Sequence, residues 1–137
     1  MKAINPYLNF DGNCGDAMKF YAKALGGELQ MQTYKDAGME TAPGGENRVL
    51  HARLEGGTPA TVIMASDAPP DQPTKFGTNL WLTVDCSDTA EQDRMFNAFG
   101  EGGQVVMPLA EQFWGARFGM IKDKFGVGWM FNCELKK

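Results

Sequence analysis

Two stretches of this sequence carry the same landmarks about 74 residues apart. The spacing from Asp11 to Gly26 equals the spacing from Asp85 to Gly100. In both stretches an apolar run typical of a strand precedes the Asp, and apolar residues at helical spacing precede the Gly. A repeat of this length predicts that one unit of several helices and strands is duplicated. Only a few folds consist of two copies of one such unit.

The first copy is predicted to contain a strand, a helix and three more strands. Residues 3–10 read as the first strand, and Asn13 is the expected cap of the helix that follows. Gly26 and Gly27 end this helix. A mobile loop rich in Gly and Pro is expected at residues 36–47. The three further strands are predicted at residues 28–34, 48–55 and 61–66.

The second copy repeats this order of elements. A strand is predicted at residues 79–84, and Asp88 with Glu91 reads as a helix start of the capping-box type. Another strand is expected at residues 104–109. Two aromatic-rich strands then close the chain, joined by a tight turn at residues 123–126.

The two copies predict a single α+β domain over residues 1–137. It consists of two βαβββ modules, at about residues 1–68 and about residues 77–137, each contributing to a mixed sheet. A chain of 137 residues can bury a core without disulfides or metals. Its cysteines are odd in number and include no Cys-x-x-Cys pair, which predicts buried thiols rather than a disulfide framework or a zinc site. They are Cys14, Cys86 and Cys133.

Charge and hydropathy exclude several classes of partner. The formal net charge is −4, so nucleic acid is not an expected partner, because binding it needs a basic face. No apolar run approaches the roughly 20 residues of a membrane span, and the first ten residues lack the apolar core of a signal peptide. We therefore expect a cytoplasmic protein that associates with neither nucleic acid nor membrane.

Several short motifs follow one another in a fixed order. They are Tyr7–Cys14, Phe20-Tyr21, His51-Ala52, Met64–Asp67, Phe113-Trp114-Gly115 and Asp123–Gly126 with Trp129. In this order they resemble the vicinal oxygen chelate superfamily, which includes glyoxalase I, extradiol dioxygenases and bleomycin-resistance proteins. Within it the chain looks like the PhnB-like branch, often labelled 3-demethylubiquinone methyltransferase-like. The resemblance implies mixed sheets around a shared cavity, and a homodimer.

Metal-dependent members of this superfamily place one ligand on each of four strands. The resemblance puts these positions at Asn5 or Pro6, Met64, Asn79 and Met130. None of these residues is His, Asp or Glu, which supply the imidazole and oxygen ligands of divalent ions. We therefore expect no metal at these positions, and no other cofactor.

Strand alternation predicts which side chains line the cavity. In each predicted strand one face is apolar and suits packing under a helix, and the other face is mixed. Walls of Tyr, Trp and Met with a few polar groups are the usual make-up of a small-molecule site. The predicted ligand-binding residues are Tyr7, Asn9, His51, Arg53, Met64, Asn79, Trp81, Trp114, Met130 and Asn132.

Three of these residues have more than one interpretation. His51, the only histidine, is the candidate catalytic acid or base or a ligand-orienting donor; it could equally be a strand histidine hydrogen-bonded at a wall or interface. Arg53 could bind a carboxylate or phosphate, or be ion-paired on its strand. Trp114 could stack on a ligand or anchor an interface. Asp67 and Asp123 read as turn residues rather than catalytic acids.

The sequence leaves three functions in competition. The favoured one is a protein that binds a small aromatic or planar compound, and the acidic balance would favour a cationic compound. The alternative is a lyase-, isomerase- or dioxygenase-like enzyme that acts on a small polar metabolite with His51 as acid or base. A scaffold that only mediates subunit contacts is the third. Methyl transfer finds no support, because no Gly-rich nucleotide loop follows a predicted strand.

Overall fold

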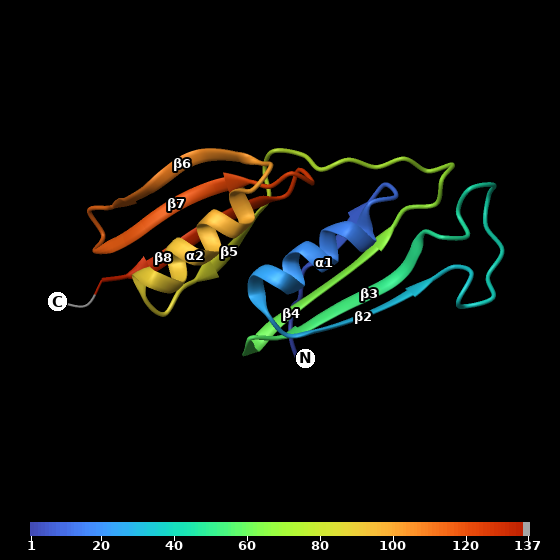
Figure 1. The fold of residues 1–137 in the computed structure, drawn as a ribbon, viewed down its shortest axis with the longest axis horizontal. Coiled ribbons are helices and arrows are strands. Elements are labelled where there is room, and N and C mark those ends of the chain that lie inside the picture. Colours follow the sequence, from blue (N-terminus) through green and yellow to red (C-terminus); the bar gives the residue numbers. More distant parts are fainter. Residues whose placement is uncertain (136–137) are drawn as a thin grey trace. The chain divides into compact units, whose positions relative to one another are not determined.

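The chain divides into two compact units, Met1–Lys75 and Phe76–Lys137 (Figure 1). The computed structural model describes residues 1–135, and for residues 58–60 the backbone alone. Each unit contains one helix and four strands. Neither helix in the described part of the chain is long and apolar enough to span a membrane.

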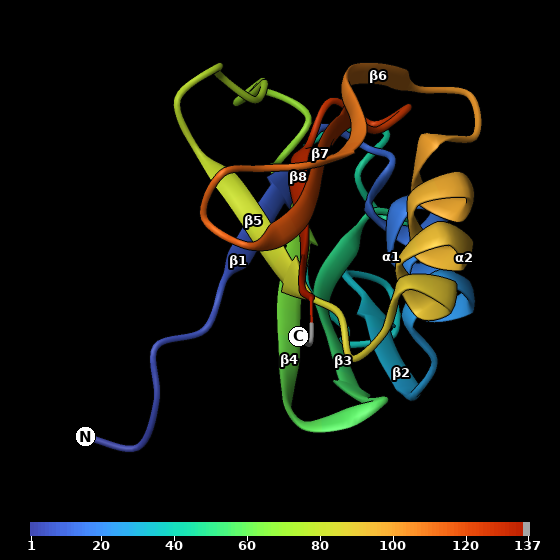
Figure 2. The same ribbon diagram turned by 90° about the vertical axis from the view of Figure 1, so that its left-hand side faces the viewer.

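Unit 1 is a four-stranded sheet with a helix on one face (Figure 2). The strand order is β1-β4-β3-β2, in which β1 runs parallel to β4 and the other pairs are antiparallel. Leu8 and Phe10 are buried under the helix, and their neighbours Tyr7 and Asn9 are exposed on the other face, as alternation predicts. The elements are β1 (Tyr7–Phe10), α1 (Cys14–Leu25), β2 (Glu28–Thr33), β3 (Val49–Gly56) and β4 (Thr58–Asp67).

Unit 2 repeats this topology. Its strand order is β5-β8-β7-β6, again with one parallel pair, β5 with β8. The order strand, helix and three strands therefore occurs twice, and the predicted α+β fold of two βαβββ modules is confirmed. The elements are β5 (Trp81–Asp85), α2 (Thr89–Gly100), β6 (Gln104–Glu111), β7 (Ala116–Lys122) and β8 (Gly128–Glu134).

Trp129 and Phe131 near the C-terminus form the core of unit 2 together with Phe96 and Phe99 of α2. The ring of Phe99 on α2 lies 4.6 Å from the ring of Trp129 and 5.4 Å from that of Phe131, between centroids. A Cβ atom at Gly119 would lie 2.7 Å from Cε1 of Phe96, so only glycine lets this ring reach the sheet. Trp129 and Phe131 thus face the helix, as predicted, and the alternate residues of β8 face away from it.

The two helices begin in different ways. At α2 the carboxylate of Asp88 accepts a hydrogen bond from the backbone N–H of Glu91 at 2.8 Å, and Glu91 accepts one from Ser87 N at 3.0 Å. The predicted helix start at Asp88 is confirmed, and the return bond of Glu91 goes to Ser87 rather than to the cap residue of a standard capping box. At α1 the prediction is wrong, because Asn13 makes no side-chain cap. The buried carboxylate of Asp67 at the end of β4 takes its place.

Two strands begin later than predicted. β1 starts at Tyr7 rather than near residue 3, and Ile4 is 88% exposed. β5 starts at Trp81 rather than at residue 79, and Leu80 is 75% exposed. In both places apolar residues precede a strand without being covered by a helix, so apolarity alone misplaces the boundary.

Candidate functional site

The helix-free face of unit 1 gathers five of the predicted site residues. It is the sheet face opposite α1. In the strand register Tyr7 lies beside Met64, and Met64 lies beside Arg53. Asn9 and His51 lie on the same face by alternation. Residues from β1, β3 and β4 thus meet on one surface.

His51 and Tyr7 form a polar pair on this face. The Tyr7 hydroxyl lies 3.5 Å from Nδ1 of His51, at the outer limit of a hydrogen bond, and the ring centroids are 6.0 Å apart. If the hydroxyl donates to Nδ1, the neutral imidazole carries its proton on Nε2. His51 would then offer a donor at Nε2, whereas the opposite direction, Nδ1–H donating to the hydroxyl, would leave Nε2 as the acceptor that a base needs.

The charge of Arg53 is already compensated. Its Nε forms an ion pair with Glu55, and its Nη1 donates to the thioether sulfur of Met64 at 3.6 Å. A ligand anion would have to compete with the Glu55 carboxylate for this guanidinium. The arrangement therefore matches the ion-paired interpretation of Arg53.

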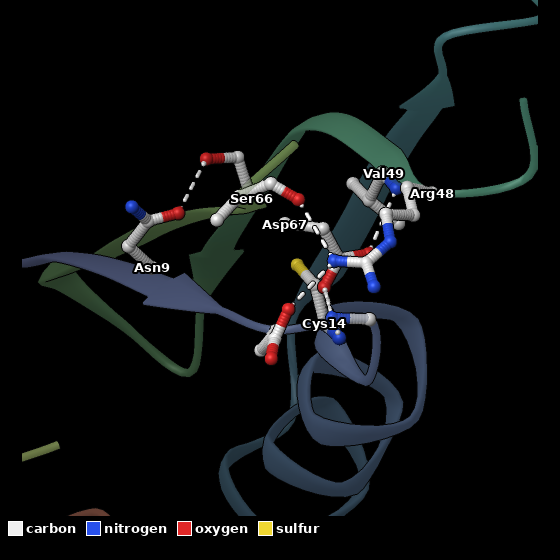
Figure 3. A network of polar contacts seen from close by, with 9 residues as sticks. Asn9, Cys14, Arg48, Val49, Ser66 and Asp67 are labelled. Carbon is white, nitrogen blue, oxygen red and sulfur yellow. Dashed lines mark hydrogen bonds and ion pairs between the residues drawn. The ribbon is translucent and has the colours of Figure 1, made fainter. Parts of the chain in front are cut away.

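Asp67 links three elements at the end of β4, on the side of the sheet that carries α1 (Figure 3). Its Oδ1 accepts from Gly12 N and Cys14 N, and its Oδ2 accepts from Val49 N, each at 2.9 Å. It is 3% exposed and is the last residue of β4, so its prediction as a turn residue is wrong. Burial, with a smaller contribution from Asp67, raises the pKa of the Cys14 thiol to about 12.

Neighbouring groups complete this network. Arg48 Nη1 donates to Asp11 Oδ1 at 2.9 Å and to Ala68 O at 2.8 Å, and Ser66 Oγ lies 3.4 Å from Asn9 Oδ1 (Figure 3). These groups hold one another in place. The network fixes the end of the sheet and offers no obvious catalytic group.

Asp123 plays the part that the sequence predicted, in the turn between β7 and β8. Its Oδ1 accepts from Phe125 N at 2.8 Å and Val127 N at 3.0 Å. Its Oδ2 accepts from the indole N–H of Trp129 at 2.8 Å. Asp123 thus ties the turn to the aromatic core, a structural role.

The helix-free face of unit 2, opposite α2, has three rows of side chains across the strands. The first row runs from Trp81 through Gly128 to Lys122. The second runs from Thr83 through Met130 to Met120, and the third from Asp85 through Asn132 to Phe118. The predicted residues Trp81, Met130 and Asn132 lie on this face. Lys122, Met120 and Phe118 were not predicted, although extending the alternation through the last hairpin would have placed them there.

Trp114 and Asn79 lie off the strands. Trp114 lies between β6 and β7, is 52% exposed, and packs edge-on against Phe118 at 5.8 Å and Phe113 at 5.2 Å. It is thus continuous with the helix-free face of unit 2. Asn79 is exposed in the segment before β5, so its predicted place at the start of that strand is wrong.

At two of the positions where the family resemblance places metal ligands, the side chains are thioethers with protein groups beside them. The sulfur of Met64 accepts from the guanidinium of Arg53, and that of Met130 lies 3.9 Å from the Thr83 hydroxyl. The positive guanidinium of Arg53 would repel a divalent ion at Met64, and a thioether is a soft ligand that hard divalent ions do not favour. Among the described residues no group of three or more His, Cys, Asp or Glu side chains could hold a metal ion.

Comparison with known proteins identifies the family. The profile of the family described as "3-demethylubiquinone-9 3-methyltransferase" matches residues 2–131. The chain belongs to this family. Its fold is that of the glyoxalase, bleomycin resistance and dioxygenase superfamily, whose members include a protein from Burkholderia phytofirmans with a TM-score of 0.64 at 15% identity, covering 97% of this chain and 100% of that one.

Several known proteins resemble nearly the whole length of this chain. YjdN of Escherichia coli is 33% identical over 94% of this chain and 93% of its own. The structure of PA1353 from Pseudomonas aeruginosa has a TM-score of 0.86 at 39% identity, covering 99% and 100% of the two chains. A PhnB protein from Bacillus cereus has a TM-score of 0.79 at 27% identity, covering 96% and 99%.

Proposed function

We propose that this protein binds a small planar organic molecule on the helix-free faces of its sheets, with no divalent ion at the superfamily's ligand positions. The observation that carries the proposal is the composition of the unit 2 face. Met120, Met130, Phe118 and Trp81 are half-buried there rather than packed into the core. Aromatic and thioether side chains adapt to flat apolar ligands, and the polar groups beside them fix orientation.

Unit 1 supports binding in a complementary way. Its helix-free face presents the Tyr7 hydroxyl, the His51 imidazole and the amide of Asn9 beside the ion pair of Arg53 with Glu55. Such groups recognise the edges of a planar molecule by hydrogen bonds. Chemistry on that molecule would need a reactive group, and the network behind this face holds its polar atoms in hydrogen bonds with one another.

A thermal-shift screen of planar drugs and metabolites tests the proposal. A ligand that binds only the folded protein stabilises it by RT ln(1 + [L]/Kd), about 2.7 kcal/mol at a hundredfold excess over Kd. We expect hits whose effect is lost in Met130→Glu, which puts a charge in the middle of the unit 2 face. Met39→Glu is the matched control, because Met39 is 49% exposed in the loop after β2. Equal loss in both variants would contradict the assignment to this face.

Metal analysis tests the remaining part of the proposal. The protein is purified without added metal and without chelator, and its divalent ions are quantified. A divalent ion retained in one-to-one stoichiometry, whose removal lowers the melting temperature, would overturn the metal-free assignment.

The alternative function is acid–base catalysis by His51, and the contact with Tyr7 favours it specifically. A hydroxyl beside Nδ1 can orient the ring and set its tautomer. The His51 ring signals are followed by NMR as pH is varied, with and without a screened ligand. If catalysis holds, ligand binding shifts the titration and His51→Gln removes turnover but not binding. An unchanged titration would eliminate this function.

We also propose a homodimer, as the family resemblance implies. The edge strand β6 supports it, because Val105 and Val106 are each 48% exposed and Met107 is 40% exposed. Exposed apolar edges invite association. Analytical ultracentrifugation should give twice the mass of one chain, and Val106→Lys should shift it towards the monomer. A wild-type monomer at high concentration would refute the dimer.

A further inference from the structure

Lys122 is the cation of the helix-free face of unit 2. It ends β7 opposite Gly128, and its ammonium lies 5.7 Å from the centroid of the Trp81 ring. The same ammonium donates to the carbonyl oxygen of Gly77 at 3.1 Å. The ring and the carbonyl hold a flexible side chain over the first row of the face.

The positive charge of Lys122 has no carboxylate partner in the described part of the chain. The ion pairs found there join Arg48 to Asp11, Arg53 to Glu55 and Arg117 to Asp93. An ammonium has three donors, and one of them is used by Gly77 O. Lys122 can therefore receive an anion without displacing an acid, which Arg53 on unit 1 cannot do.

The face beyond Lys122 is apolar along the direction of β7. Met120 and Met130 lie in the second row beside Thr83, and Phe118 lies in the third row with Trp114 against its edge. Lys122 lies four residue steps along β7 from Phe118, which corresponds to about 13 Å. The surface therefore has a positively charged end at Lys122 and an aromatic end at Phe118 and Trp114.

We propose that the ligand of unit 2 is an organic acid, with its carboxylate on Lys122 and its planar or apolar body along Met120 and Met130 towards Phe118. This inference rests on the proposed small-molecule binding and names the ligand's chemical class. The inference differs from the preference for cationic ligands that the net charge of −4 indicates for the protein as a whole. Charges more than about 8 Å away are largely screened at physiological salt, whereas an ammonium in contact with the ligand is not.

Three probes that share a naphthalene ring system and differ in charge test which ligand charge the face prefers. They are 2-naphthoate, neutral 2-naphthamide and the cation 2-naphthylmethylammonium. Affinities are measured by calorimetry, and the labelled methyl groups of Met120 and Met130 are followed by NMR. We expect both methyl signals to move and naphthoate to bind tightest, by about fivefold over the amide, as an ion pair at a partly exposed site would provide.

Variants of two lysines separate recognition from a structural role. Lys122→Met should abolish the preference for naphthoate and leave naphthamide affinity unchanged, and Lys122→Arg should restore the preference. Lys124→Met is the matched control, because the Lys124 ammonium lies over a ring in the same way, 5.4 Å from that of Phe125. It lies on the turn after β7 and should change nothing.

The remaining outcomes overturn the inference in distinguishable ways. If naphthamide binds as tightly as naphthoate, or the cation binds best, the organic-acid assignment fails while small-molecule binding stands. If Lys122→Met weakens the binding of all three probes equally, Lys122 has only a structural role, which is to hold the segment around Gly77 in place. If no probe binds or moves a methyl signal, both the inference and the proposed binding of planar molecules by unit 2 fail.

Discussion

The indole ring of Trp81 lies across Gly128, its partner on the neighbouring strand β8. A Cβ atom at Gly128 would lie 2.6 Å from Cε3 and 2.9 Å from Cδ2 of this ring. The absence of a side chain on one strand is thus what lets the ring of the other lie over the sheet and approach Lys122. The first row of the face depends on this one glycine.

Gly128→Ala should destabilise the protein by about 1–3 kcal/mol, the usual cost of overpacking. The cause is the Trp81 ring rather than backbone strain, since Gly128 is not among the residues with positive φ. Chemical denaturation measures the change, and near-UV circular dichroism reports the moved indole. In a Trp81→Ala background the same substitution should cost little, so a double-mutant cycle that shows no coupling would contradict this contact.

Asp67→Asn should destabilise the protein by about 2 kcal/mol or more, because hydrogen bonds to a buried charged acceptor are stronger than neutral ones. The carboxylate accepts three backbone N–H groups, and an amide would turn a donor towards one of them. Urea denaturation gives the free energy of unfolding. Asp71→Asn serves as the control in the exposed linker and should fall within about 0.5 kcal/mol of wild type.

Gln92→Met should lower the free energy of unfolding by about 1–3 kcal/mol. The volume of the side chain changes little in this substitution. The side chain is fully buried on α2, and its amide donates to Arg117 O at 2.8 Å and Phe131 O at 3.1 Å. The variant leaves both carbonyl groups buried without this donor. Gln112→Met is the control, because it removes a hydrogen bond of the same kind, from Nε2 to Ala110 O, at an exposed position. Thermal denaturation should show a clearly lower melting temperature for Gln92→Met than for Gln112→Met.

Stability should fall in alkaline solution because two thiols resist ionisation in the folded state. Burial raises the pKa of Cys14 and of Cys86 from 9.0 to about 12, with smaller contributions from Asp67 and from Glu91 respectively. The unfolded chain releases these protons first, so the stabilisation is complete below about pH 9 and is lost as pH rises towards 12. Denaturation between these pH values should show a shallower decline in Cys14→Ala and Cys86→Ala.

The same thiols should react slowly with a disulfide reagent at pH 8, because the thiolate is the reacting species. All three cysteines are free and buried. Full labelling should require denaturant. Rapid labelling of Cys14 in the native protein would show that its surroundings open far more readily than the packing implies.

Much of the fold followed from local patterns. The repeat of Asp and Gly landmarks predicted the two modules, and strand alternation placed Tyr7, Met64 and Met130 on faces away from the helices. These features depend on residues a few positions apart, which a sequence displays directly. The aromatic spacing around Gly119 likewise encoded the packing of α2 on its sheet.

The errors lie where distant residues decide the structure. Asp67 reads as a turn residue by composition, but its hydrogen-bond partners lie up to 55 positions away in the chain. Lys122 was not predicted, and only the register of β5, β7 and β8 sets it opposite Gly128 and near Trp81. Asn79 was misplaced because apolar Leu80 suggested a strand that starts only afterwards.

The two ways of starting a helix differ in how long each first turn waits for its side-chain cap during synthesis. The first turn of α2 is capped by Asp88 and Glu91, so its capping groups are present as soon as that turn itself has been synthesised. The first turn of α1 waits for Asp67, which is synthesised 53 residues after Cys14. At about 5–20 residues per second this is a delay of several seconds. The first helix of the chain to be made is thus the one that must wait for its cap.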